Sequence, residues 1–345
     1  MQAIALPACF RLYSNHSAFR ECGRSKQKRY QYDGLGRLVN VREDPHGLNY
    51  STSYYYDALD HLTAVSQGYC PACQSRWFGY DNAGRLTSAS NPESGTVQYA
   101  YDGVGNLQAR SDARGIVTNY TYDPLDRLQT VAYSDGTPAV TYTYDAPGLL
   151  YAKGQLASVG TVDSVTRFTG FDALGRVAAS QQETEGQTYR FAYTYNRAGA
   201  LASETYPSGR VVTTSYDGAN RPTQLTGARN GQNQTYLAQA VYGSQGAPQS
   251  YLYGNTVGYR ASYNARLQPT ILTHALNNQD SSLLLRLSPN WGTTNNNGTL
   301  QSLLQENGGS SVQQSFTYDP VNRLQTATDT GGWSRRFTYD AYGNG

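Results

Sequence analysis

Charge, methionine and long apolar runs are all scarce in this chain, and each shortage excludes a class of protein. Only 15% of its 345 residues are charged and the formal net charge is +2, so no basic run predicts a nucleic-acid partner. A single methionine and a polar composition leave little material for helical bundles. Apolar runs such as residues 3–6 and 149–152 fall far short of the roughly 20 residues that a membrane-spanning helix needs. The first ten residues have no basic segment before their apolar stretch, so no ordinary signal peptide is evident.

Tyrosine, glycine and proline are abundant instead. The chain has 31 Tyr against 8 Phe. A tyrosine ring is apolar, but its hydroxyl needs a hydrogen-bond partner or water. This composition therefore predicts a thin sheet with wet faces rather than a thick, dry core. The 35 Gly and 13 Pro indicate a chain rich in turns.

A short motif recurs along the chain: a Tyr-Asp pair, or a close variant, with Leu or Val five positions after the Asp. The clear copies begin at Tyr32, Tyr56, Tyr80, Tyr101, Tyr122, Phe171, Tyr195 and Tyr318. Less regular copies begin at Tyr144, Tyr216, Tyr242, Tyr263 and Trp291, and a truncated copy begins at Tyr339. The step between copies is often 21 residues, a period typical of solenoid-like arrays. We expect a non-repeat segment at 1–29 and an array of about 13 repeats at 30–345, degenerate near 236–300.

Each repeat has the pattern of a β-hairpin. In residues 97–101 and 119–122, aromatic residues alternate with small or polar ones, so the two kinds of side chain face opposite sides of a strand. The Asp that follows opens a turn, because its carboxylate can accept a backbone N–H two residues on. The fourth turn position is Gly in most copies and Asp or Asn in others, residue types that tolerate positive φ. The predicted structural turn residues are Asp33, Asp57, Asp81, Asp102, Asp123, Asp172, Asp319, Gly36, Gly84, Gly105 and Gly175.

Two strands and two turns fill such a repeat and leave no room for a helix. About 13 repeats of two strands make a strip on the order of 125 Å long. Open twisted sheets of more than about ten strands curl. The predicted fold class is therefore all-β, with tandem antiparallel β-hairpin repeats in a curled, spiral sheet like a shell or tube.

The motif Tyr-Asp-x-x-Gly-Arg-Leu at this spacing resembles the RHS/YD-repeat family, and the resemblance covers residues 32–345. The family includes the cocoon-forming subunits of bacterial Tc toxins, polymorphic-toxin shells and teneurin ectodomains. The resemblance implies a structural protein that forms a wall segment of a hollow shell, tube or filament, outside the cell or in a toxin or secretion context. We expect no enzymatic activity and no cofactor, and an extracellular or cell-surface location.

The repeated side chains of the turns have a structural and a chemical interpretation. The carboxylates could form acid–base pairs, but they occupy one turn-capping position in every copy, which favours a structural role. The arginines that follow could form an anion-binding ladder. We expect them instead to stack on neighbouring tyrosines or to pair with the turn aspartates. They are Arg37, Arg85, Arg127, Arg176 and Arg323.

The four cysteines all lie near the N-terminus. Cys70 and Cys73 have the spacing of metal ligands, and Cys9 and Cys22 could complete a zinc site with four thiolates. An even number of cysteines in an exported protein also suits disulfides, and free thiols are the third alternative. A link of either kind would attach the N-terminal segment to the array.

Two functions compete, and they imply different partners. As a wall segment, the chain would associate with itself through the unpaired strand edges at the ends of the array, or with further repeats of a longer chain. As an adhesion or carbohydrate-binding module at the cell surface, it would use its tyrosine-rich faces, since sugar rings pack on aromatic faces. Tyrosines that stack on one another to hold the strand register favour the wall.

Overall fold

A computed structural model describes residues 11–13, 17–20, 27–68, 73–293, 296–340 and 343. The chain divides into two compact units. Unit 1 comprises Met1–Val117, Trp291–Gln301 and Gln314–Gly345, and unit 2 comprises Thr118–Asn290 and Ser302–Gln313. Both units consist of antiparallel β-strands, and within each unit consecutive strands pair with one another. The predicted all-β fold of tandem hairpins is confirmed.

Unit 1 holds the first ten strands and the last ones. The strands are β1 (Arg11–Tyr13), β2 (Ser17–Arg20), β3 (Lys28–Tyr32), β4 (Leu38–Glu43), β5 (Tyr50–Tyr56), β6 (Leu62–Gln67), β7 (Gln74–Tyr80), β8 (Leu86–Asn91), β9 (Gly95–Tyr101), β10 (Leu107–Ser111), β28 (Leu324–Asp329), β29 (Ser334–Arg336) and residues 314–318 of β27 (Ser310–Tyr318). Pairs follow chain order from β1 to β10 and from β27 to β29. The predicted boundary at residue 29 falls inside β3, and the division into a non-repeat segment and an array stays a prediction.

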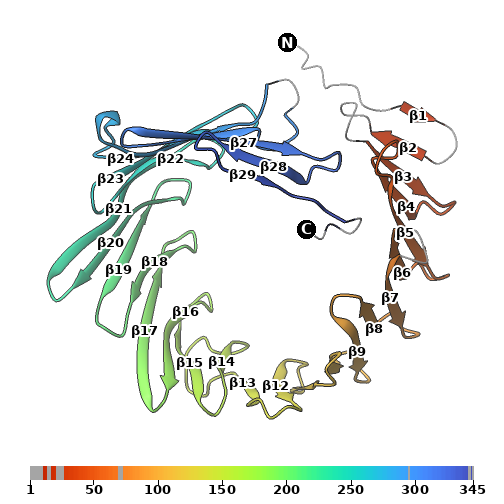
Figure 1. The fold of residues 1–345 in the computed structure, drawn as a ribbon. Helices are drawn as coiled ribbons and strands as arrows, with labels where there is room; N and C mark the ends of the chain where they lie inside the picture. The colour runs from red at the N-terminus through yellow and green to blue at the C-terminus, as the bar shows by residue number, and fades with distance from the viewer. Residues whose placement is uncertain are drawn as a thin grey trace, which may run out of the picture. The chain divides into compact units, whose positions relative to one another are not determined.

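Unit 2 holds the middle of the array. Its strands are β11 (Val117–Tyr122, from Thr118), β12 (Leu128–Tyr133), β13 (Val140–Tyr144), β14 (Leu156–Gly160), β15 (Ser164–Phe171), β16 (Val177–Thr184), β17 (Gln187–Tyr195), β18 (Leu201–Thr205), β19 (Val211–Tyr216), β20 (Pro222–Arg229), β21 (Gln232–Tyr242), β22 (Pro248–Tyr253), β23 (Val257–Tyr263), β24 (Pro269–Leu276), β25 (Leu283–Asn290) and β26 (Ser302–Asn307). Within this unit the strands follow one another along a curved band (Figure 1). The curvature agrees with the expectation that a long twisted sheet curls.

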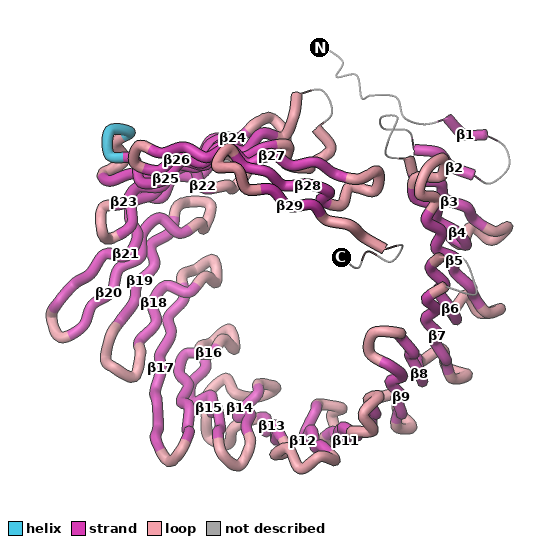
Figure 2. The backbone as a smooth tube through the Cα atoms, viewed as in Figure 1, coloured by secondary structure: helices cyan, strands magenta, loops and turns pink. Residues whose placement is uncertain are grey.

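Helix is almost absent from the part of the chain that the structure describes. It is limited to η1 (Asp280–Ser282), a single 3₁₀ turn before β25 (Figure 2). Loops and turns connect all other elements. A repeat of about 21 residues is indeed filled by strands and turns.

The two faces of the sheet differ as the alternation predicts. In β11, Tyr120 and Tyr122 are half-buried on one face, which we call the aromatic face. Asn119 and Thr121 are exposed on the other face. Thr121 and Thr130 form a cross-strand hydrogen bond of 2.6 Å between their hydroxyls there, so we call it the hydroxyl face. The same kind of bond joins Thr143 to Ser158, Thr194 to Ser203 and Thr317 to Thr326.

The core is thin and sits against the aromatic face. Val131 is buried opposite Tyr120, and Ala89 is buried opposite Phe78. Among the described residues, no large side chain is fully buried. The hydrophobic contribution to stability is therefore spread over many partly covered rings rather than concentrated in one core.

Candidate functional site: a ladder of turn residues

The carboxylate of the turn Asp organises each hairpin. Between β3 and β4, Asp33 Oδ1 accepts the backbone N–H groups of Leu35 at 2.9 Å and of Arg37 at 3.0 Å. The sequence indicated the first bond, whereas the second bond, from four residues on, was not foreseen. Both bonds occur at all seven predicted turn carboxylates, which are Asp33, Asp57, Asp81, Asp102, Asp123, Asp172 and Asp319.

The fourth turn residue adopts the left-handed backbone conformation. φ lies between +75° and +105° at Gly36, Gly84, Gly105 and Gly175, and between +59° and +69° at Asp60, Asp126 and Asn322. A left-handed residue at this place produces a bulge in the hairpin. The strand register accordingly shifts by one residue just before the Tyr of the motif, as between Thr121 and Tyr122. The bulge leaves the Tyr side chain on the aromatic face beside the turn.

The Arg that follows the turn connects two repeats. Arg127 Nε donates to Asp123 Oδ2 at 2.7 Å. The centre of its guanidinium lies 4.3 Å from the ring centroid of Tyr144, the last residue of the first strand of the next hairpin. The guanidinium therefore bridges the carboxylate of one repeat and the aromatic ring of the next. The same arrangement, with guanidinium-to-ring distances of 4.5 to 5.1 Å, occurs for Arg37 over Tyr56, Arg85 over Tyr101, Arg176 over Tyr195, Arg221 over Tyr242 and Arg323 over Tyr339.

The Tyr hydroxyl supplies a second connection, which the sequence pattern does not indicate. Tyr144 Oη donates to the backbone carbonyl of Leu128, the residue that follows the turn of the preceding repeat, at 2.9 Å. The same bond to the preceding repeat, at 2.6 to 3.0 Å, is made among the described residues by Tyr56, Tyr80, Tyr101, Tyr144, Tyr195, Tyr216, Tyr242, Tyr263, Tyr318 and Tyr339. We call the turn Asp, its Arg and the next Tyr a rung, and the series of rungs the Asp–Arg–Tyr ladder.

One rung carries a histidine in place of the arginine. His61 Nδ1 lies 2.9 Å from Asp57 Oδ2, and its ring stacks on Tyr80 with 4.8 Å between centroids. An imidazole fills less of the space between the repeats than a guanidinium and carries a full charge only when protonated. We therefore expect this rung to hold its two repeats together less strongly than a rung with arginine.

We expect His61→Arg to raise the free energy of unfolding by about 0.5 kcal/mol at neutral pH, because a permanent cation would then lie over the Tyr80 ring. Urea unfolding followed by circular dichroism measures the change. In the background of Asp57→Asn the gain is expected to shrink, since the guanidinium would lose its carboxylate. An unchanged or lower stability of His61→Arg would contradict the ladder as the source of inter-repeat stability.

The ladder keeps its carboxylates ionised. The hydrogen bond from the Arg127 side chain holds the pKa of Asp123 below its usual value of 3.8. The side chains of Arg176 and Arg221 lower the pKa of Asp172 and Asp217 in the same way. A carboxylate with a lowered pKa and its oxygens engaged by donors is a poor proton acceptor or donor near neutral pH. Its chemistry in this place is that of a fixed acceptor.

These lowered pKa values predict acid sensitivity. In the unfolded chain the same carboxylates take up protons at higher pH, so the unfolded state binds more protons as the pH falls. The stabilisation is complete above the unfolded value of about 4 and is lost as the pH falls through the lower folded values. Urea midpoints measured from about pH 6 down to about pH 2 should fall, and Asp123→Asn should show a flatter profile. Constant midpoints over this range would contradict the ionised ladder.

Of the four cysteines, the structure describes Cys73. Cys9, Cys22 and Cys70 lie outside the described residues. Cys73 is disulfide-bonded, with a partner outside the described part of the chain. No group of three or more potential metal-ligating side chains occurs among the described residues. Whether all four cysteines act together stays a prediction.

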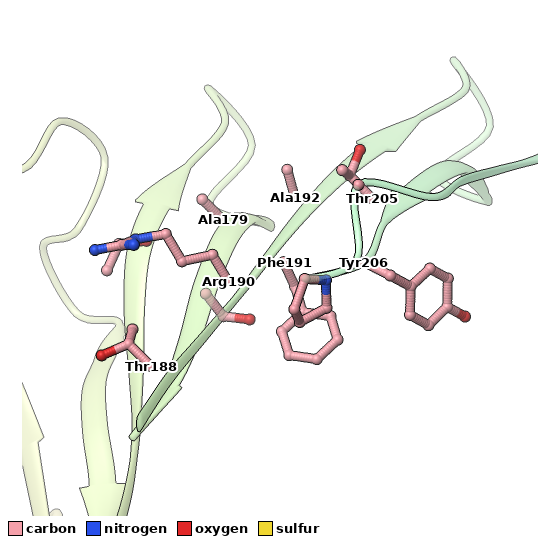
Figure 3. A pocket seen from close by; sticks show the side chains of 11 residues that line it. Ala179, Thr188, Arg190, Phe191, Ala192, Thr205 and Tyr206 are labelled. Carbon is pink, nitrogen blue, oxygen red and sulfur yellow. The ribbon is translucent and has the colours of Figure 1, made fainter. Parts of the chain in front are cut away.

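Unit 2 contains an open cavity of about 480 Å³ beside β16, β17 and the turn after β18 (Figure 3). The described residues that line it include two ionisable side chains, Arg190 and Tyr206, and Arg190 points away from Phe191 and Tyr206 (Figure 3). The Tyr206 hydroxyl donates to Glu204 at 2.9 Å, and this bond raises the pKa of Tyr206. The cavity offers a cation and hydroxyls but does not bring a nucleophile and a base together.

The fold and the ladder define a class of protein: a tandem β-hairpin repeat array whose repeats are fastened by side chains of their turns. A family model described as Teneurin YD-shell matches residues 11–155 and 49–248, more than half of the chain. The chain therefore belongs to the teneurin YD-shell family. It is a structural wall segment of such a shell, as the sequence resemblance implied.

Solved structures share this fold at low sequence identity. TcdB2-TccC3 without its hypervariable C-terminal region matches with a TM-score of 0.83 and 16% identity over 96% of this chain. The Tc holotoxin pore of Photorhabdus luminescens matches with a TM-score of 0.84 and 16% identity over 97% of this chain. The chain covers 20% of each of those chains. A search of curated proteins by sequence finds no match. No helix in the described ranges is long and apolar enough to span a membrane.

Proposed function

We propose that this chain is a wall segment of an exported, multi-subunit toxin shell, that further YD repeats cover its rims, and that the wall itself catalyses no reaction. The observation that carries the proposal is the Asp–Arg–Tyr ladder, whose side chains connect successive hairpins. The toxin context is supported by the shared fold of the Tc holotoxin pore and TcdB2-TccC3. The chain spans about a fifth of those chains, so most of such a shell would come from other segments.

The surface of the chain suits a wall that separates two spaces. Its accessible surface is 22153 Å², whereas a compact protein of 37.8 kDa exposes about 14,000 Å². The excess is expected of a single-layer sheet that leaves both faces open. Stability then depends on strand pairing and on the ladder, which leaves the faces free to meet the contents on one side and solvent on the other.

One rim of the sheet carries unusual apolar side chains. The residue two positions after the turn Asp is 69% to 76% exposed at Leu35, Leu59 and Val104 in unit 1 and at Leu125 and Leu174 in unit 2. In an antiparallel meander, all turns between a first and a second hairpin strand lie on one rim of their unit. Apolar side chains at one exposed repeat position indicate a surface that becomes covered. A partner with the same spacing along its rim is a further set of YD repeats.

The mass distribution of the 345-residue chain tests this assembly. Sedimentation velocity should show reversible association that weakens when Leu35, Leu59 and Val104 are all replaced by Ser. Val162, which is 89% exposed in a turn of the opposite rim, provides the matched control, and Val162→Ser should associate as the parent does. A parent chain that stays monomeric at tens of micromolar, or a triple variant that associates equally well, would contradict assembly through this rim.

The absence of catalysis is supported by the engagement of the carboxylates. Asp81, Asp102 and Asp123 each accept two or more backbone N–H bonds and one side-chain bond. Replacing all three with Ala should lower the thermal midpoint by removing turn acceptors, without abolishing any activity measured for the protein. A hydrolase activity that one of these changes removes, with the fold intact by circular dichroism, would refute the structural role.

A further inference from the structure

The Asp–Arg–Tyr ladder is interrupted in unit 2, at the junction between the repeat of β21 and β22 and the repeat of β23 and β24. The turn of the first repeat begins with Gly243 instead of Asp, and Ala247 occupies the position of the Arg. Tyr263 of the next repeat still donates its hydroxyl to the Pro248 carbonyl at 3.0 Å. This rung therefore supplies neither a carboxylate nor a guanidinium to join the two repeats.

Three tyrosines and a histidine gather at the same junction. Tyr251 on β22 pairs directly with Tyr259 on β23, and their rings stack with 4.6 Å between centroids and 18° between planes. The Tyr253 ring meets the Tyr251 ring edge-on at 5.1 Å, and the two hydroxyls lie 3.1 Å apart. The His274 ring lies 5.4 Å from that of Tyr259. We call these four residues the junction cluster, and its stacked pair spans two repeats.

The stacked pair is sheltered, but the junction cluster has an exposed edge. Tyr251 and Tyr259 are half-buried. Burial raises the pKa of Tyr259 to about 12 and raises the pKa of Tyr251 as well, so neither ring carries a charge at neutral pH that would push the stack apart. Tyr253 is 38% exposed and connects the pair to solvent through its hydroxyl. An oxidant can therefore act at the edge of the cluster while strand pairing holds the two stacked rings together.

We propose that Tyr251 and Tyr259 are a site of oxidative cross-linking, at which a dityrosine joins the two repeats. A haem peroxidase supplied with hydrogen peroxide would remove one electron and the hydroxyl proton from each phenol. The two phenoxyl radicals then couple through a carbon–carbon bond between their Cε atoms, and the hydrogens on those carbons move to the oxygens and restore both phenols. The pair loses two hydrogen atoms in total, and one hydrogen peroxide takes them up to give two waters.

The geometry favours this pair over the other tyrosines of the cluster. Coupling needs two ring edges to meet, and directly opposed residues of an antiparallel pair have their Cβ atoms about 5 Å apart. Tyr253 lies on the same strand as Tyr251 and its ring is turned by 88°, so a link between these two would join no repeats. A link between Tyr251 and Tyr259 would instead give this junction a covalent bridge where it lacks the arginine. The inference does not rest on the toxin context.

Peroxidase treatment of the intact 345-residue chain in dilute solution, with an equimolar amount of hydrogen peroxide, tests the proposal. Trypsin then releases residues 230–260 as one peptide, because no Lys or Arg lies inside it before Arg260. We expect this peptide to be lighter by two hydrogen atoms and to give no fragment ions from cleavage between residues 251 and 259. Dityrosine fluorescence should appear together with the mass change.

Phenylalanine variants identify the two linked residues. Tyr251→Phe and Tyr259→Phe should each abolish the linked peptide, since a phenyl ring forms no phenoxyl radical. Tyr236→Phe is the matched control, because Tyr236 lies in the same peptide but its hydroxyl accepts a hydrogen bond from Arg210 at 2.9 Å. It should keep the link. Oxidation should also raise the urea midpoint of the parent chain, because a cross-link restricts the unfolded state, and should leave that of Tyr259→Phe unchanged.

Three results would overturn the proposal. The first is a peptide 230–260 of unchanged mass once the peroxide has been consumed. The second is a link that ends at Tyr253 instead of Tyr259. The third is dityrosine that forms only between separate chains. None of these results bears on the wall function, which the ladder variants test independently.

Discussion

Tyr144→Ala is expected to lower the free energy of unfolding by about 3 kcal/mol. The change removes a half-buried ring, the cation–π contact with Arg127 at 4.3 Å and the hydroxyl bond to the Leu128 carbonyl at 2.9 Å. All three connect one repeat to the preceding one, so the loss should be felt at the junction between repeats. Urea unfolding gives the magnitude. Hydrogen exchange should show the strongest loss of protection in β12, β13 and β14.

Two milder variants separate the contributions of ring and hydroxyl. Tyr144→Phe keeps the ring and leaves the Leu128 carbonyl without its donor, so it should cost about 1 kcal/mol. Tyr142→Phe is the matched control on the same strand, because the Tyr142 hydroxyl makes no hydrogen bond within the described residues. It should change stability by less than about 0.5 kcal/mol. Equal effects of the two Phe variants would show that the hydroxyl bond does not fasten the repeats.

Gly84→Val is expected to cost about 2 to 3 kcal/mol, the other large effect. Gly84 has φ +76°, a conformation that a β-branched residue adopts only at high energy. A Cβ at this position would also lie 2.8 Å from His61 Nε2 of the preceding repeat. The imidazole would have to move, and its stacking on Tyr80 and its contact with Asp57 would suffer. Thermal or urea unfolding measures the combined effect.

Substitutions at other turn positions separate the backbone strain of Gly84→Val from its steric clash with His61. Gly36 has the same left-handed conformation, with φ +82°, but no atom lies within 4 Å of its would-be Cβ. Gly36→Val should therefore show the backbone strain alone, about 1 to 2 kcal/mol. Asp126→Gly should be tolerated, because glycine adopts the φ of +59° found there. A Gly84→Val protein as stable as the parent would mean that the turn is misplaced.

The sequence alone predicted the local features of each repeat. Alternation in residues 119–122 correctly placed Tyr120 and Tyr122 on one face and Thr121 on the other. The interchange of Gly with Asp60 and Asn322 correctly indicated a left-handed turn residue, as their φ values show. These features depend on neighbours within a few residues, so a one-dimensional pattern contains them.

Contacts that join two repeats could not be predicted from the sequence pattern in the same way. The Tyr144 hydroxyl reaches a carbonyl 16 residues away, and its direction depends on the bulge before Tyr144 and on the register of β13 with β14. A carbonyl is present in every residue, so no side-chain pattern marks the acceptor. The sequence offered two partners for the arginines, turn aspartates or neighbouring tyrosines. The structure shows that one guanidinium uses both.

The choice of glycine at particular turns also has an inter-repeat cause. The Arg85 guanidinium lies 3.6 Å from where a Cβ at Gly105 would be, and the Arg176 guanidinium lies 3.8 Å from that of Gly199. In contrast, the carboxylate of Asp60 receives a 2.7 Å ion pair from Arg37. At these three turns the left-handed residue is either a glycine beside the preceding arginine or an acid that binds it. These contacts depend on the distance between repeats, which the sequence does not contain.

Electron cryomicroscopy of the full-length product that contains this chain is the most direct test of the wall. The account predicts a hollow particle in which residues 30–340 form one continuous strip, with one hairpin per repeat and density joining each motif Tyr to the turn of the preceding repeat. A particle in which these residues fold into a filled, compact domain, or in which successive hairpins are not paired, would contradict the account.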